Sequence, residues 1–162
     1  MIQSPILPGF NADPSICEVG DGCCIDTSTL ERYWGVLTPH SRDFQNWQLL
    51  AHTLHEQIDL SGVPSSGGGP SSGGVCSPAL THCGSVIDLC YTVVHQHEPA
   101  TKDTSNFLTT AKSIGWPWTP PVFVHSSGFD TSLFHDESGQ KFWLNMVWDR
   151  RPGHHLFYGN AL

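Results

Sequence analysis

Two aspartates, Asp13 and Asp130, are the residues whose type and setting could do chemistry. Asp13 lies in residues 9–16 (GFNADPSI) and Asp130 in residues 129–134 (FDTSLF), so each follows a turn and opens a short apolar run. The proline after Asp13 disfavours helical backbone, which predicts a side chain presented at a strand entrance. Two such carboxylates around one site could supply the acid and base steps of glycoside hydrolysis. For either aspartate alone, the alternative is a turn cap.

The elements that must position these carboxylates repeat along the chain. Residues 13–28, 76–92 and 130–145 share a small or acidic opening residue, an apolar run, a turn with glycine and a second apolar run. This pattern predicts three β-hairpins. After the first two hairpins come a polar turn, a tryptophan and a further strand (residues 40–49, and 110–118 with 120–124). Four-stranded units that recur every ~40 to 60 residues are typical of a β-propeller, and a β-sandwich is the competing interpretation.

The repeat predicts an all-β fold with about two and a half blades of four-stranded antiparallel sheet. We expect one incomplete domain over residues 1–162, with the Gly/Ser/Pro-rich residues 63–74 as an inserted surface loop. Residues 50–60 have some helical spacing and are allowed at most one turn of helix. Open strand edges would remain. We therefore expect a part of a larger architecture, or a chain that associates with itself or with a partner chain.

The composition limits the classes of partner. The net charge of −8 argues against nucleic acid and against an anionic membrane surface. No apolar run approaches the ~20 residues of a transmembrane helix. Residues 1–5 (MIQSP) lack a basic and apolar leader. We expect a cytoplasmic protein, or a secreted one whose leader has been removed.

The cysteines and histidines predict no cofactor. The six cysteines lack the C-x-x-C spacing of zinc or redox sites, which favours free buried thiols over disulfides. His95 and His97 could share a strand face and bind zinc together with His82 and Cys83. We favour surface histidines instead, and expect neither a metal nor another cofactor.

Several longer motifs resemble those of one known family, glycoside hydrolase family 43, in its β-xylosidase/α-arabinofuranosidase branch. The resemblance covers essentially the whole chain. It rests on residues 5–16 (PILPGFNADPSI), 40–43 (HSRD) with Trp47, 102–104 (KDT) with Asn106, 126–136 (SSGFDTSLFHD), 145–149 (NMVWD) and 151–153 (RPG).

This resemblance implies a five-bladed β-propeller that hydrolyses terminal xylose or arabinose units of pentose oligosaccharides with inversion. By its motif, Asp13 matches the general base, and Asp130 matches the aspartate that orients the general acid and tunes its pKa. The resemblance also implies that Phe129, Asn106 and Arg151 bind the substrate.

The sequence departs from the family pattern at several positions. The family's general acid is a glutamate of a later blade, and no residue of this chain matches it. Cys76 and Leu30 stand where the family usually has tryptophan and phenylalanine in the sugar pocket, and residues 23–26 (CCID) replace an aromatic strand. The isolated chain is therefore predicted to be weakly active or inactive. The alternative is a non-catalytic carbohydrate-binding or structural half-propeller that associates with another chain.

Overall fold

The computed structural model describes residues 2, 4–29, 35–54, 74–98, 101–115, 117–148 and 155–161, and these residues form strands and connections without a helix. The eleven strands are β1 (Ala12–Val19), β2 (Gly22–Ser28), β3 (Val36–Ser41), β4 (Gln48–Thr53), β5 (Gly74–Cys83), β6 (Val86–Glu98), β7 (Thr101–Ala111), β8 (Val122–His125), β9 (Phe129–His135), β10 (Lys141–Trp148) and β11 (His155–Ala161). The predicted all-β class is confirmed.

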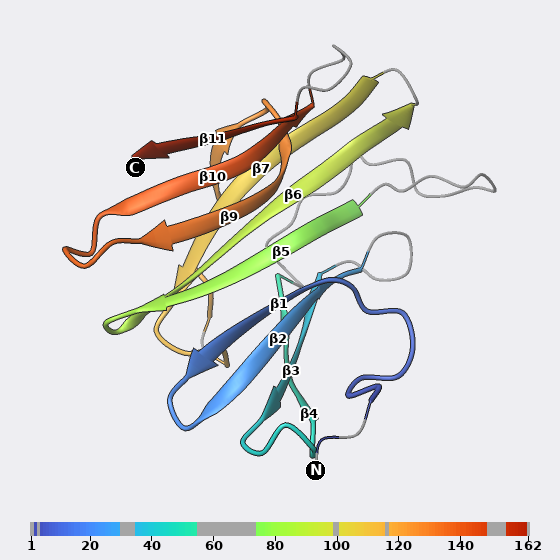
Figure 1. Cartoon of the computed structure of the whole chain (residues 1–162), viewed down its shortest axis with the longest axis vertical. Helices are drawn as coiled ribbons and strands as arrows, with labels where there is room; N and C mark the ends of the chain where they lie inside the picture. The colour runs from blue at the N-terminus through green and yellow to red at the C-terminus, as the bar shows by residue number, and fades with distance from the viewer. Residues whose placement is uncertain are drawn as a thin grey trace.

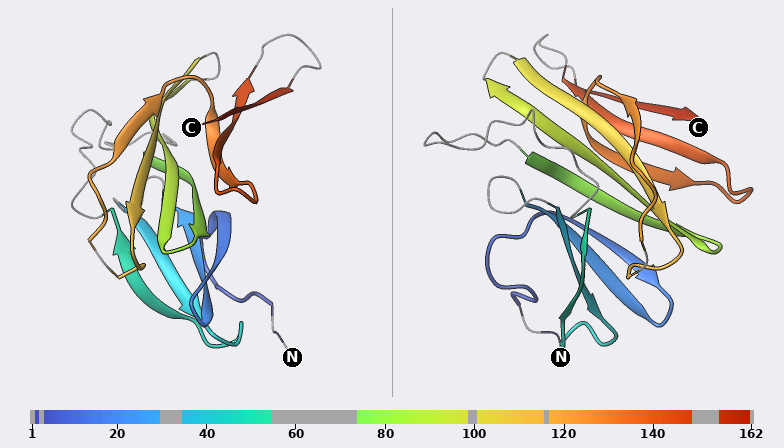
Figure 2. Two further views of the ribbon diagram at one scale, coloured as in Figure 1. Left: turned by 90° about the vertical axis from the view of Figure 1, so that its left-hand side faces the viewer. Right: turned by 180° about the vertical axis from the view of Figure 1, so that it is seen from behind.

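The strands form three antiparallel sheets (Figure 1), each a meander in chain order: β1-β2-β3-β4, β5-β6-β7-β8 and β9-β10-β11. The first strands of the three sheets, β1, β5 and β9, lie side by side, because β5 contacts both of the others. Figure 2 shows the same succession from two further sides. The sheets are therefore successive blades, and their first strands line one shared edge.

The three predicted hairpins are β1–β2, β5–β6 and β9–β10. Gly20 and Gly84 occupy equivalent turn positions, with φ of 66° and 62°. This left-handed backbone is available to glycine at little cost. The turns are therefore encoded locally, as the glycine in each repeat predicted.

Two apolar clusters bind the sheets together. The larger fills the space between the first and second sheets and contains Cys24, Val36, Leu54, Val75, Leu80, Ile87, Leu89, Tyr91, Val93, Ala111, Ile114 and Trp118. The smaller lies between the second and third sheets and contains Cys90, Leu133 and Trp143. Burial of these side chains is the main stabilising term that fixes one blade against the next.

A buried carboxylate also joins the second sheet to the third. Asp88 of β6 is 0% exposed. Its Oδ1 lies 2.6 Å from Nζ of Lys141, and its Oδ2 lies 3.3 Å from Nε2 of His135. Because an unpaired buried charge is costly, this contact favours one packing of the two sheets.

Some predictions lie at or beyond the limits of the described residues. Residues 50–53, within the segment allowed at most one turn of helix, belong to strand β4, which pairs with β3, so cross-strand backbone pairing prevails there over the local helical spacing. Residues 55–60 lie outside the described residues. So do residues 63–73 of the predicted loop, while Gly74 already belongs to β5. The extent of the domain stays a prediction.

The structure holds all six cysteines as thiols. Within the described ranges, no three His, Cys, Asp or Glu side chains are grouped so that they could hold a metal ion. The same ranges contain no helix that is long and apolar enough to cross a membrane.

Candidate functional site

The first strand of each blade carries the same backbone irregularity near its start. Asp13, Ser77 and Asp130 have φ of 50°, 46° and 53°, and the strand pairing shifts register around each of them. A positive φ is uncommon outside glycine and clusters at functional sites. The equivalence of Asp13 and Asp130, expected from the repeat, is therefore seen in the backbone. Their counterpart in the second blade is Ser77. The sequence repeat, which opened its second copy at Cys76, was wrong by one residue.

Hydrogen bonds connect these three positions across the blades. Ser28 of β2 donates from Oγ to Oδ2 of Asp13 at 2.6 Å, and its Oγ accepts the backbone N–H of Ser77 at 2.7 Å. Ser77 donates from Oγ to Oδ1 of Asp130 at 2.7 Å. The thiol of Cys76 lies 3.8 Å from Oδ2 of Asp13. The structure thus brings the two predicted catalytic carboxylates into one hydrogen-bonded network.

Both carboxylates belong to exposed residues, whereas Ser28 is only 1% exposed. A carboxylate with one oxygen anchored and the other open to solvent can accept a proton from a water molecule. Asp13 and Asp130 are both exposed and each is anchored by a serine hydroxyl, and their catalytic roles stay predictions.

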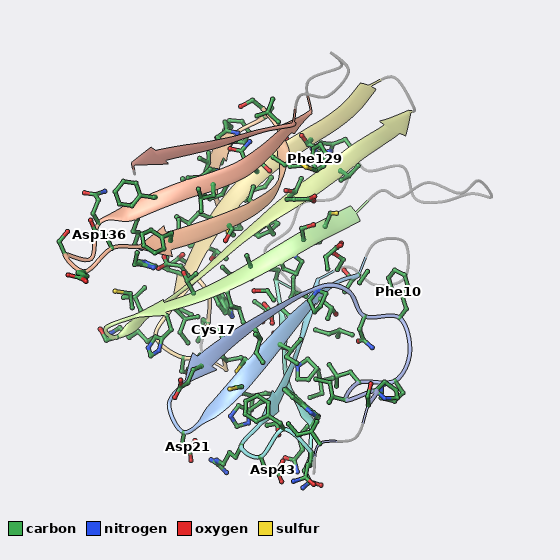
Figure 3. All side chains as sticks on the ribbon, viewed as in Figure 1. Phe10, Cys17, Asp21, Asp43, Phe129 and Asp136 are labelled. Atoms are coloured by element: carbon green, nitrogen blue, oxygen red, sulfur yellow. The ribbon has the colours of Figure 1, made fainter. Side chains whose placement is uncertain are left out.

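Phe129 precedes Asp130 and lies at the start of β9, where it pairs with Met146 (Figure 3). Its side chain is 6% exposed. Only a small part of the ring reaches solvent, and its predicted contact with substrate stays a prediction.

Asn106 lies inside the second blade and is 0% exposed. Its Oδ1 accepts a hydrogen bond from Thr92, and its Nδ2 lies 3.1 Å from the carbonyl oxygens of His125 and Gly128. In this structure Asn106 therefore holds the turn that precedes Phe129 and Asp130, and its predicted role in substrate binding stays a prediction. Arg151, the remaining predicted binding residue, lies outside the described residues, as does Leu30.

The same turn has two further supports. Thr104 donates from Oγ1 to the carbonyl of Gly128 at 2.8 Å, and Asn145 donates to the carbonyl of Ser127 at 2.8 Å. Gly128 has a φ of 81°, and a Cβ there would collide with Asn145 and Met146. Close packing from both sides therefore fixes the backbone that leads into Asp130.

Sequence reasoning missed Ser28 and Ser77 as members of the site. One signal was present for Ser77, because Ser77-Pro78 repeats the polar-residue–proline order of Asp13-Pro14. No local signal marks Ser28, which reaches the site from the second strand of its blade.

Comparison of the sequence with models of known protein families shows to which family the chain belongs. The model of glycosyl hydrolases family 43 matches residues 2–162. The chain belongs to this family. The resemblance drawn from the motifs is thereby confirmed.

Similar family 43 proteins have been named for their activity. The chain is 46% identical over 163 aligned positions to a xylosidase/arabinosidase 43B of Humicola insolens and 44% identical over 160 to a β-xylosidase of Bacillus subtilis. The alignments cover 99% and 98% of this chain but 29% of each relative. The chain thus spans under a third of the length of these relatives.

Solved structures of the family agree with the fold. The chain matches the xylan β-1,4-xylosidase of Bacillus halodurans with a TM-score of 0.86 at 42% identity, covering 99% of this chain and 31% of that one. A family 43 protein of Bacteroides ovatus matches with a TM-score of 0.72 at 28% identity, covering 99% and 32%. These neighbours are five-bladed propellers, so the three sheets are part of such a propeller.

Proposed function

We propose that Asp13 and Asp130, with the residues that hold them, form part of the active site of an inverting glycoside hydrolase that releases terminal xylose or arabinose from pentose oligosaccharides. In this proposal Asp13 is the general base. Its carboxylate takes a proton from a water molecule as the water oxygen attacks the anomeric carbon from the face opposite the leaving group. Asp130 orients the general acid that protonates the leaving oxygen.

The observation that carries the proposal is the equivalent presentation of the two carboxylates. Asp13 and Asp130 occupy the same bulged, left-handed position on β1 and β9, and a network through Ser28 and Ser77 joins them. Relatives named xylosidase/arabinosidase and β-xylosidase support a pentoside as the substrate class.

The general acid is assigned by family resemblance to a glutamate that none of the 162 residues matches. Each general acid or base step contributes about 10²- to 10⁴-fold to the rate. We therefore expect the 162-residue polypeptide alone to release 4-nitrophenol from β-xyloside and α-arabinofuranoside substrates little faster than a blank. Robust turnover that Asp13→Asn abolishes would show that these residues suffice for catalysis.

A chimera tests the proposed roles directly. These residues would replace the matching 29% of the Bacillus subtilis β-xylosidase, to which they are 44% identical. We expect the chimera to hydrolyse 4-nitrophenyl β-xyloside and to release α-xylose first, as seen by proton NMR. Asp13→Asn should lower kcat about 10²- to 10⁴-fold, because water then lacks its base.

Asp21 provides the matched control. It lies in the turn between β1 and β2, at the end of the hairpin away from Phe129 (Figure 3), and forms an exposed ion pair with Arg42 at 2.7 Å. Asp21→Asn should leave kcat unchanged. A chimera whose rate survives Asp13→Asn, or whose first product is β-xylose, would contradict the inverting mechanism. Binding of xylo-oligosaccharide without any turnover would favour a carbohydrate-binding module.

A further inference from the structure

The two carboxylates of the site are connected by a hydrogen-bonded chain whose direction is determined by chemistry. An ionised carboxylate only accepts, and a backbone N–H only donates. Ser28 must therefore give its single hydroxyl proton to Asp13 while it accepts from the N–H of Ser77, and Ser77 must give its hydroxyl proton to Asp130. The two bonds from a serine hydroxyl to a carboxylate are 2.6 and 2.7 Å long, as is usual for a charge-assisted O–H donor, and the bond of 2.7 Å from the N–H of Ser77 to Ser28 is at the short end for an N–H donor.

Ser77 is the central member of this chain. It occupies the blade position equivalent to Asp13 and Asp130, with a φ of 46° that is unfavourable for serine. Its backbone N–H donates to Ser28, which holds Asp13, and its hydroxyl donates to Asp130. One residue is therefore connected to both carboxylates. Hydrogen bonds on both sides thus hold a backbone conformation that serine rarely adopts.

The anchoring selects one oxygen of each carboxylate. The donors from Ser28 and Cys76 both reach Oδ2 of Asp13, and the donor from Ser77 reaches Oδ1 of Asp130. Within the described part of the chain, no hydrogen bond reaches Oδ1 of Asp13 or Oδ2 of Asp130. These are the oxygens that remain for a water molecule and for an acid partner.

We propose that Ser77 is a positioning residue that holds Asp130 directly and Asp13 through Ser28, so that the orientations of the two carboxylates are coupled. Its consequence for the reaction rests on the proposed function. The coupling itself is a property of the folded chain, and it is measurable without turnover.

Carbon-13 NMR of the aspartate carboxyl carbons in the 162-residue chain tests this coupling. Asp130→Gly removes the acceptor of the Ser77 hydroxyl while tolerating the positive φ. Asp130→Asn removes the same charge but keeps an acceptor oxygen. We expect Asp130→Gly to displace the Asp13 carboxyl resonance by more than its linewidth, and Asp130→Asn to displace it less.

The same substitution is then made with the chain of hydrogen bonds interrupted. Ser77→Gly keeps the N–H and relieves the backbone but removes the hydroxyl, and Ser28→Ala removes the link to Asp13. In both backgrounds, Asp130→Gly should leave the Asp13 resonance where it is. If Asp130→Gly does not fold, the reverse cycle serves, with Asp13→Gly observed at the Asp130 carboxyl.

An equal displacement in all three backgrounds would overturn the proposal, because the effect would then travel through space or through the whole fold. No displacement in the unmodified background would overturn it as well. In an active chimera, Ser77→Gly should lower kcat roughly 10- to 100-fold with little change in KM, since a misplaced base loses rate before binding. If the two carboxylates are coupled in the NMR experiment but the chimera is inactive, the positioning role of Ser77 stands and the proposed function is refuted. If the chimera is active but the carboxylates are not coupled, the proposed function stands and the positioning role is refuted.

Discussion

Asp26 offers the sharpest test of how the first two blades pack. It lies on β2 opposite Ser15 of β1, and Ser15 accepts a hydrogen bond from the N–H of Leu80 in the second sheet. Residues paired across antiparallel strands share a face, so Asp26 points toward the second sheet. Its carboxyl is 0% exposed, and neither oxygen meets the geometry of a hydrogen bond within the described residues, although the Thr38 hydroxyl is near.

The magnitude follows from the shift in acidity. Burial raises the pKa of Asp26 from 3.8 to about 7, with the Thr38 hydroxyl acting weakly in the opposite direction. Between these two values the folded state holds a proton that the unfolded state has released. The free energy of unfolding therefore falls as pH rises from 4 to 7. At 1.36 kcal/mol per pKa unit, the loss above pH 7 is about 4 kcal/mol.

The assay is urea unfolding of the parent chain and of Asp26→Val at a series of pH values between 4 and 8. Valine is close in size and suits a strand, so it removes the buried carboxyl without a large cavity. We expect the two proteins to be similar near pH 4 and the variant to be more stable by about 4 kcal/mol at pH 8. Glu137→Gln removes an exposed carboxyl and serves as the control. Its difference from the parent in the free energy of unfolding should not grow between pH 4 and pH 8.

A constant difference between Asp26→Val and the parent across this pH range would refute the reasoning. It would mean that the carboxyl ionises in the folded state as readily as in the unfolded one. A variant less stable than the parent at pH 8 would mean that Asp26 has a partner that stabilises its charge.

Three other predictions follow from packing. Lys141→Met should lower the free energy of unfolding by roughly 2 kcal/mol in urea titrations, because the buried Asp88 loses its cation. Adding Asp88→Leu should recover most of that loss. A double variant whose loss equals the sum of the two single losses would contradict this. Cys90 is 0% exposed, and burial raises the pKa of its thiol to about 12, whereas Cys76 is partly exposed. In native protein at pH 8, iodoacetamide should therefore alkylate Cys76 and not Cys90, as mass spectrometry would reveal. Phe134 is 55% exposed on β9 and lies beside Phe142 of β10, with ring centroids 6.2 Å apart, so the two rings form a contiguous apolar surface. We expect the isolated chain to self-associate in sedimentation experiments and Phe134→Ser to weaken that association; a parent chain that stays monomeric would contradict it.

Much of the fold could be predicted from the sequence because its signals are local. Alternating apolar residues, with Gly20 and Gly84 in the turns, specify hairpins wherever the segment lies in the protein. The motifs around Asp13 and Asp130 placed both aspartates at strand entrances, and the strands begin there.

The partners of these aspartates could not be predicted, because they depend on contacts between blades. The order Ser77-Pro78 hinted at the equivalence of Ser77 with Asp13, but only the matching bulges of β1 and β5 established it. The motif around Asn106 also gave no sign that this side chain is buried beside β6 and holds the turn before Asp130, because that placement depends on the pairing of β6 with β7.

The sequence by itself thus determined the strands, their turns and the two carboxylates at strand entrances, because backbone propensity and turn chemistry act over a few residues. The tertiary structure decided which side chains meet. Ser28 and Ser77 join the carboxylates, and Asp26 is enclosed between sheets, only because successive blades pack face against face. Burial and hydrogen bonding across that packing depend on residues about 50 positions apart, a distance over which no local pattern carries information.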